Sequence, residues 1–230
     1  MKTILSGKII GSAGVLTVAV LAGMLGSSRR VEAQGGSEQL LIREGFAIAP
    51  VPLNLAGKDP NLVGYGSYLV NAVGDCNGCH TAGGPPNFDY AAGYNPYFGQ
   101  PKKVDPTTYL AGGQDFGPVG PPSNPGPDII ARNLTPDKTG MAEGGHTLKE
   151  FIKIIRTGAD LDHLHPTCTL GVTVNCIPAP VDGSLLQVMP WPTFQNMTDR
   201  DLTAIYEYLS SIPCIEGPTD PKNPLHNDCQ

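Results

Sequence analysis

Charged residues are scarce in this sequence, and the basic ones are fewer than the acidic ones. Only 16% of the 230 residues are charged, and the formal net charge is −6. An acidic surface repels the phosphate backbone, so no nucleic acid is expected as a partner. The sequence also shows no internal repeat, catalytic triad, paired carboxylate motif or phosphate-binding loop. It therefore lacks the patterns that are typical of repeat proteins, hydrolases and nucleotide-binding enzymes.

Glycine and proline are abundant instead, with 29 and 23 residues. Such a composition predicts many loops, but 40% of the residues are hydrophobic, which is enough for a packed core. A chain of this length forms one domain with extensions or two small ones.

The motif with the most specific chemistry is Cys76-Asn77-Gly78-Cys79-His80. Two cysteines separated by two residues and followed at once by histidine form the attachment pattern of c-type haem. Both thiols lie on about one helical turn and can add to the two vinyl groups on one porphyrin edge, with His80 against the iron. A thioredoxin-like pair lacks this histidine, and a structural zinc site needs a second ligand pair. The sequence therefore predicts one covalent haem c held by Cys76, Cys79 and His80.

Residues 1–33 resemble an export signal. Lys2 and Lys8 precede an uncharged apolar run over 9–26, and Ala33 ends a small-x-small cleavage pattern. We expect a cleaved signal peptide, with an uncleaved N-terminal membrane anchor as the alternative because the apolar run is long. In both cases the remaining chain is expected in the periplasm or elsewhere outside the cytoplasm. Membrane association, in the second case, would be through the N-terminus.

Four further cysteines agree with an oxidising compartment. Sequence proximity favours the pairs Cys168–Cys176 and Cys214–Cys229, although four cysteines permit three pairings, and buried free thiols are the alternative. The second pair would pin a C-terminal tail over 214–230.

The segments around the motif differ in pattern. Residues 34–60 contain several prolines and are expected to be extended, whereas 61–75 has helical periodicity and leads into the motif. Residues 83–130 form an irregular Gly/Pro-rich insert with scattered aromatic residues. We favour a small local core for these aromatics, with a docking surface or haem cover as the alternative.

Two later helices have clear boundaries. Thr147 and Glu150 form a capping box that begins a helix, and Gly158 ends it. Thr198-Asp199-Arg200-Asp201 begins the last helix, with Met197 and Leu202 placed to form a hydrophobic staple, and Pro213 ends it.

The sixth iron ligand is expected to be a methionine. Beyond residue 33, methionine occurs at 141, 189 and 197. Met189 lies between Val188 and Pro190 in a proline-restricted loop, which suits a thioether held against iron. Met197 is explained by packing at the start of the last helix, and gap filling is the structural alternative for Met189. His163 and His165 are expected to be solvent-exposed loop residues.

A His80/Met189 pair fills both axial positions and favours electron transfer, because neither oxidation state must change its ligands. Arg156 and Trp191 are expected to contact the cofactor or its propionates.

These motifs, in this order, resemble class I cytochrome c, and more narrowly the cytochrome c domains of membrane-bound alcohol and aldehyde dehydrogenases. The matching residues are Gly66-Ser67-Tyr68-Leu69-Val70, Gly74-Asp75-Cys76, Cys79-His80-Thr81, Asn133-Leu134-Thr135-Pro136-Asp137, Phe151, Arg156-Thr157-Gly158, Met189-Pro190-Trp191, Met197-Thr198-Asp199 and Asp201-Leu202. The resemblance implies an all-α class I cytochrome c fold over 61–213, with its first and last helices crossing near the haem edge. It also implies a redox partner protein, either a periplasmic dehydrogenase or a terminal oxidase.

The sequence thus predicts an exported monohaem electron carrier or a haem subunit of an oxidoreductase complex, rather than a stand-alone enzyme. One alternative is a haem enzyme, a peroxidase or a thiol-oxidising cytochrome, with a labile sixth ligand. Another is an oligomer in which single haems line up between chains.

Overall fold

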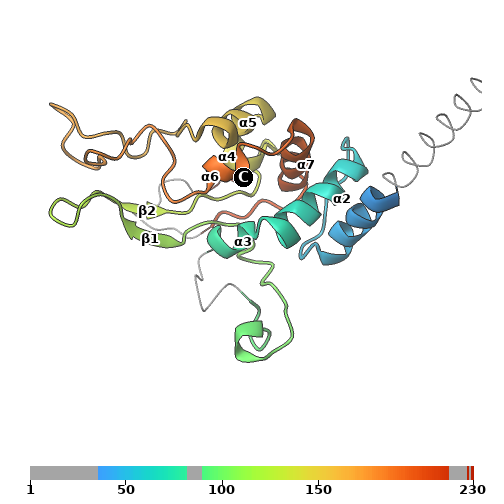
Figure 1. Cartoon of the computed structure of the whole chain (residues 1–230). Coiled ribbons are helices and arrows are strands. Elements are labelled where there is room, and N and C mark those ends of the chain that lie inside the picture. The colour runs from blue at the N-terminus through green and yellow to red at the C-terminus, as the bar shows by residue number, and fades with distance from the viewer. Residues whose placement is uncertain (1–35, 82–89, 218–226, 228) are drawn as a thin grey trace, which may run out of the picture. The chain divides into compact units, whose positions relative to one another are not determined.

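The computed structural model of the chain describes residues 36–81, 90–217, 227 and 229–230. The chain divides after Leu40 into two compact units, and the second unit contains every element labelled in Figure 1. The expected signal peptide or anchor over 1–33 lies outside the described residues. Of the helices that are described, none is both long enough and apolar enough to cross a membrane.

The second unit is mainly helical (Figure 1). In chain order its elements are α2 (Pro60–Tyr68), a π-helical turn (Leu69–Val73), α3 (Cys76–Cys79), a 3-10 turn (Pro96–Phe98), β1 (Asp115–Pro118), β2 (Asp128–Ile130), α4 (Ala142–Gly145), α5 (Leu148–Thr157), α6 (Trp191–Phe194) and α7 (Asp199–Leu209). The helices expected around 61–75, after Thr147 and after Thr198 are therefore confirmed.

The strands β1 and β2 correct the expectation of an all-α fold. They pair antiparallel, with Asp115 opposite Ile130 and Pro118 opposite Asp128. Both come from the Gly/Pro-rich insert, which has no helical periodicity. Phe116 and Ile129 of this hairpin line the central cavity, so a strand pair supplies part of an apolar wall.

The N-terminal segment is another correction, because residues 36–48 are helical rather than extended. The prolines that argued against a helix lie beyond its last turn, at Pro50 and Pro52. Gly45 permits a close approach to α2, since a Cβ at this position would lie 1.9 Å from the carbonyl oxygen of Gly64. The buried hydroxyl of Ser67 donates to the Gly45 carbonyl at 2.6 Å. Tertiary packing against α2 therefore stabilises this helix.

The first and last helices of the domain pack closely, as the family resemblance implied. Gly66 of α2 faces the α7 backbone, where a Cβ would lie 1.9 Å from the carbonyl oxygen of Ala204. Tyr208 adjoins this contact and is fully buried, and its hydroxyl lies 2.9 Å from that of buried Tyr109. The amide of Asn71 also donates to the Tyr208 hydroxyl, at 3.1 Å. These contacts fix the segment that leads into the Cys-x-x-Cys-His motif.

The aromatic residues of the insert do not form one local core. Tyr109 is buried in the main core, whereas Tyr97 and Phe98 are 64% and 61% exposed. The preferred small local core is therefore wrong for these residues, because Tyr109 joins the main core and Tyr97 and Phe98 are exposed. Phe88 lies outside the described residues.

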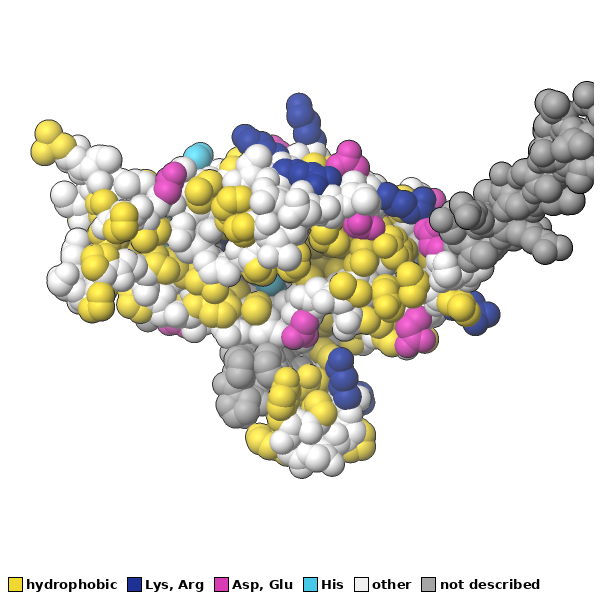
Figure 2. All heavy atoms as spheres, viewed as in Figure 1, with side chains coloured by type: hydrophobic (Ala, Val, Ile, Leu, Met, Phe, Trp, Pro, Cys, Tyr) yellow, Lys and Arg dark blue, Asp and Glu magenta, His cyan; other side chains and the backbone are white. Residues whose placement is uncertain are grey.

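One end of the second unit has no charged side chain. Its two loops are 116–127 and 164–181, and the second contains the Cys168–Cys176 disulfide. The loops are in contact, since a Cβ at Gly120 would lie 2.8 Å from the ring of Pro178. Leu170 is fully exposed there, and Val174 is 82% exposed. Figure 2 shows this end, on the left, largely in yellow and white.

Helix α5 begins with the expected capping box. The Thr147 hydroxyl accepts from the Glu150 N–H at 3.3 Å, and the Glu150 carboxylate accepts from the Thr147 N–H at 2.9 Å. The Thr147 hydroxyl also donates to this carboxylate at 2.7 Å, and these bonds lower the pKa of Glu150. The helix ends at Gly158, whose φ of 69° is left-handed.

Replacing Thr147 with alanine is expected to lower the free energy of unfolding by about 1 kcal/mol, because first-turn N–H groups lose their acceptor. Chemical denaturation measures this loss, with Thr157→Ala on the exposed end of α5 as the control. Because the pKa of Glu150 is lowered in the folded state, its stabilising contribution is present above its ordinary pKa and disappears as pH falls through the lowered value. Equal losses in both variants would contradict a specific capping role.

Candidate haem site

Helix α3 is a single turn that carries both cysteines of the motif. It extends over Cys76–Cys79, and His80 follows at its end. The carboxylate of Asp75 packs against Gly78, where a Cβ would lie 2.6 Å from Oδ2. A side chain at this position would collide with Asp75, which explains glycine between the two cysteines. Neither cysteine takes part in a disulfide bond.

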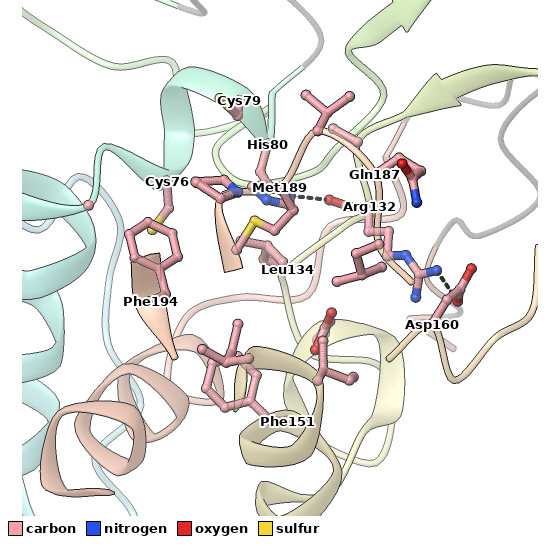
Figure 3. Close-up of a pocket in the computed structure, with 18 of the residues that line it drawn as sticks. Cys76, Cys79, His80, Arg132, Leu134, Phe151, Asp160, Gln187, Met189 and Phe194 are labelled. Carbon is pink, nitrogen blue, oxygen red and sulfur yellow. Dashed lines mark hydrogen bonds and ion pairs between the residues drawn. The ribbon is translucent and has the colours of Figure 1, made fainter. Parts of the chain in front are cut away.

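A mainly apolar cavity of about 390 Å³ lies beside α3, within the range of about 300–1,000 Å³ that is usual for cofactor and ligand pockets. Figure 3 shows the cavity wall, in which Cys76, Cys79, His80 and Met189 all take part. The structure therefore brings together four of the six expected cofactor-binding residues. Other parts of the wall come from Phe151 and Ile155 of α5, Phe194 of α6 and Leu202 of α7.

The orientation of His80 leaves one ring nitrogen for a metal. Its Nδ1 lies 2.8 Å from the carbonyl oxygen of Arg132 (Figure 3). A carbonyl only accepts, so Nδ1 carries the proton and Nε2 keeps its lone pair. Burial also lowers the pKa of His80, which favours the neutral imidazole that binds metals. A hydrogen bond of this kind orients most metal-bound histidines.

Met189 is presented to the same cavity by a constrained turn. The residue before it, Val188, has a φ of 68°, which is rare for a β-branched side chain. The Met189 N–H donates to the Gln187 carbonyl at 2.7 Å, and the Trp191 N–H donates to the Met189 carbonyl at 2.8 Å. Met197 lines the cavity as well, so two methionines border it.

Trp191 and Arg156 lie outside the wall of this cavity. Gly158 permits close packing by Trp191, because a Cβ there would lie 2.2 Å from the indole ring. The Trp191 Nε1–H donates to the Leu186 carbonyl at 3.3 Å. Arg156 donates to the Gln195 carbonyl and, at 2.6 Å, to Asp199. Both side chains thus hold the segment around α6, and a direct role toward the cofactor stays a prediction.

Sequence reasoning missed a group of charged residues beside the cavity. Arg132 donates to Asp160 and Asp162, which are distant from it in the sequence. His146 Nε2 lies 3.6 Å from Asp162 Oδ1. Glu143 is buried close to this group, and burial raises the pKa of its carboxyl. No spacing pattern connects these residues, so their proximity could be found only in the folded chain.

The two loop histidines behave differently. His163 is exposed, as expected. His165 is half-buried, lines the cavity and has a buried Nδ1 for which the described structure provides no hydrogen-bond partner. The expectation of solvent exposure was therefore wrong for His165, because the loop that carries it folds over the cavity.

The cysteine environment does not suit thiolate chemistry. Burial, with a smaller contribution from Asp75, raises the pKa of Cys76 to about 12. The pKa of Cys79 is also raised, chiefly by burial. Reactive thioredoxin-like cysteines have lowered pKa values, so this environment disfavours the thioredoxin-like alternative.

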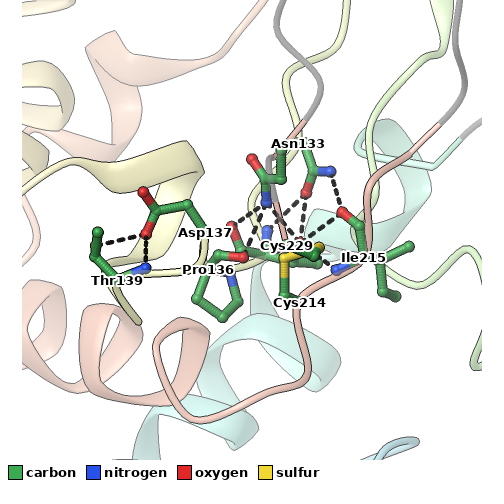
Figure 4. The surroundings of a disulfide bond; sticks show 9 residues. Asn133, Pro136, Asp137, Thr139, Cys214, Ile215 and Cys229 are labelled. Carbon is green, nitrogen blue, oxygen red and sulfur yellow. Dashed lines mark hydrogen bonds between the residues drawn. A yellow bond between two sulfur atoms is a disulfide. The ribbon is translucent and has the colours of Figure 1, made fainter.

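The remaining cysteines form the two expected disulfides, Cys168–Cys176 and Cys214–Cys229. The second attaches the tail beside the 133–137 turn (Figure 4). There the Asn133 amide donates to the Ile215 carbonyl at 2.7 Å. The adjacent Leu134 lines the cavity, so the tail supports one part of the site.

The comparison with known proteins agrees with this geometry. The chain is 28% identical to the cytochrome c subunit of an alcohol dehydrogenase (quinone) from Gluconacetobacter polyoxogenes, over 72% of this chain and 24% of that protein. It is 27% identical to the cytochrome subunit of a fructose dehydrogenase from Gluconobacter japonicus, over 70% and 23% of the two chains. It is 29% identical to the cytochrome c subunit of a gluconate 2-dehydrogenase from Pantoea cypripedii, over 64% and 22%. This chain is a relative of cytochrome c subunits.

The expected resemblance to dehydrogenase-associated cytochromes c is therefore confirmed. None of the known family models matches the sequence. The matched segment spans about a quarter of the length of these cytochrome c subunits, 24% in the first. The relationship supports a cytochrome c fold for the helical part and haem c as the cofactor.

The residues present fit a covalent haem. The cavity combines apolar walls for the porphyrin faces, two thiols on one turn, an imidazole with an available nitrogen and a thioether. Each of these groups supplies a different part of haem c attachment and ligation.

Proposed function

We propose that this chain is an electron-transfer haem subunit, with a single haem c attached through Cys76 and Cys79 and ligated by His80 and Met189. The observation that carries the proposal is the hydrogen bond from His80 Nδ1 to the Arg132 carbonyl inside a cavity that also contains Met189. It is the arrangement expected of an oriented iron ligand. The haem, when bound, supplies the one-electron couple.

The chain's own residues would keep that couple confined to electron transfer. The Arg132 carbonyl holds the imidazole in one tautomer, and the turn at Val188 aims the thioether. Phe151 and Leu202 exclude water from the cofactor faces, which favours the less charged ferrous state. If His80 and Met189 both held the iron, it would have no free position for peroxide, which distinguishes this proposal from the haem-enzyme alternative.

We further propose that the partner is a periplasmic dehydrogenase and that electrons pass onward to a terminal oxidase or another acceptor. The names of the three relatives support a dehydrogenase partner. The uncharged end formed by 116–127 and 164–181 suits a stable subunit contact, because the centres of such interfaces are depleted of charge. Export, by a signal peptide or with an anchor over 1–33, agrees with the two disulfides.

The function is tested on the purified full chain. One haem per chain, a near-infrared methionine–ferric band and a reversible one-electron wave in voltammetry are the expected results. Low peroxidase and thiol-oxidation activities are expected in the same preparation. Rapid turnover of peroxide or thiol, together with absence of the near-infrared band, would instead establish the haem-enzyme alternative.

A further inference from the structure

One carboxyl group on the cavity wall has no polar partner for one of its oxygens. Glu143 is 8% exposed, and its Oε2 is buried without a hydrogen-bond partner among the described residues. The residue lines the same cavity as His80 and Cys76. An ionised carboxylate in such a place has lost water without gaining a hydrogen bond, which is unfavourable.

The backbone keeps Glu143 in this position. Its φ is 51°, in the left-handed region, and its N–H donates to the Leu134 carbonyl at 3.3 Å. Its own carbonyl accepts a hydrogen bond from His146 Nδ1 at 2.9 Å. The next residue, Gly144, donates from its N–H to the Thr135 carbonyl at 3.3 Å. These bonds fix the backbone from which the Glu143 carboxyl extends toward the cavity.

A permanent cation close to Glu143, Arg132, is already shared by other acids. Arg132 forms ion pairs with Asp160 and Asp162, so ionised Glu143 would add a third negative charge around one guanidinium. Burial, and less strongly Asp162 and Asp160, raises the pKa of Glu143, while His146 and Arg132 act in the opposite direction. The result is a raised pKa.

Among the described residues, the elements packed around this turn present the following titratable and charged groups to it. They are His146 of the turn itself, Arg132 after β2, Asp160 and Asp162 after α5, Asp137 beside Gly145, and Tyr206 of α7, whose hydroxyl donates to the His146 carbonyl at 2.8 Å.

We propose that Glu143 binds one proton when the haem iron is reduced and releases it when the iron is oxidised. The partner dehydrogenase supplies the electron to ferric iron, and water supplies the proton that converts the carboxylate to the neutral acid; oxidation reverses both transfers. Reduction removes one positive charge from the cavity, so a buried carboxylate on its wall loses that attraction. Electron transfer by this chain would thereby be coupled to proton transfer. The inference rests on the proposed haem function.

The direction of the pH dependence follows from this coupling. Glu143 would have one pKa in the ferric protein and a higher pKa in the ferrous protein. At pH values between these two, reduction is accompanied by the uptake of one proton by Glu143. The midpoint potential then falls as pH rises. At most, each pH unit changes the ratio of oxidised to reduced protein tenfold. For a one-electron couple this corresponds to a change in midpoint potential of about 59 mV per pH unit. Because the pKa is raised, this slope is expected above the ordinary carboxyl value of 4.5.

Spectroelectrochemical titration of the full haem-loaded chain tests the proposal. Wild type and Glu150→Gln, which neutralises an exposed acid on α5, should share the pH-dependent potential. Glu143→Gln keeps the size of the side chain and should lose most of the slope. In reduced-minus-oxidised infrared difference spectra, a carboxylic acid C=O band should appear on reduction and shift in protein carrying isotope-labelled glutamate.

A potential that does not vary with pH in the wild type would overturn the proposal. An unchanged slope in Glu143→Gln would also overturn it and would assign the proton to a haem propionate, His146 or His165. If Glu143→Gln does not fold, wild type labelled in its glutamate residues but not in its haem decides, because a propionate band does not then shift. Failure of the proposed function itself would look different, since no reversible one-electron haem couple would then be measured.

Discussion

Replacing Met189 with alanine is expected to abolish the near-infrared methionine–ferric band and to lower the midpoint potential. The fall should be on the order of 0.2 V, within the range of about 0.8 V that axial ligands command. A thioether stabilises ferrous iron, so its loss favours the ferric state. His165 also lines the cavity. If His165 replaced Met189 as an iron ligand in this variant, the midpoint potential would also fall. Absorption spectra and potentiometric titration measure both effects.

The matched control is Met197→Ala. Met197 is half-buried and borders the same cavity just before α7, so its truncation removes a methionine of similar burial. We expect a loss of about 1–2 kcal/mol in unfolding free energy from the cavity created, with the near-infrared band retained. If Met197→Ala lost the band and Met189→Ala kept it, the assignment of the sixth ligand would be wrong.

Replacing Gly66 with alanine is expected to lower the free energy of unfolding by about 2–3 kcal/mol. The new Cβ would lie 1.9 Å from the Ala204 carbonyl oxygen and 2.5 Å from its carbon. Both atoms belong to the backbone of α7, so the two helices must move apart. The better helix propensity of alanine, worth about 1 kcal/mol, offsets only part of this loss.

Gly36→Ala is the control for this substitution. Gly36 is helical, and no described atom outside its own helix backbone and chain neighbours lies within 4 Å of the position of its Cβ, so the unfolding free energy should hardly change. Denaturant titration compares the two variants, and the haem spectrum reports whether the displacement of α2 reaches the motif. Equal stability of the two variants would contradict the close packing of α2 on α7.

Several features of this protein follow from the sequence because their causes are local. The spacing of Cys76, Cys79 and His80 depends on one helical turn, and the structure places all three on the cavity wall. The capping box at Thr147 and Glu150 needs residues only three positions apart. The proximity of the cysteines in sequence was likewise enough to predict both disulfides. Met189 could be singled out because proline restricts its own loop.

Tertiary structure decided the features that depend on distant residues. Residues 36–48 are helical because Gly45 can approach Gly64 closely, and no periodicity in the proline-containing segment indicated this. The hairpin β1–β2 likewise joins residues that have no helical pattern.

The electrostatics of the site were also beyond sequence reasoning. The carbonyl that orients His80 belongs to Arg132, and the guanidinium of Arg132 pairs with Asp160 and Asp162. One oxygen of Glu143 has no hydrogen-bond partner in the described part of the chain, because the fold buries it near a cation that is already paired. The sequence by itself indicated haem c and the residues that we propose attach it, since covalent attachment requires a fixed local spacing. Only the tertiary structure determined which charges surround that cofactor, because burial and ion pairing arise when separate segments meet.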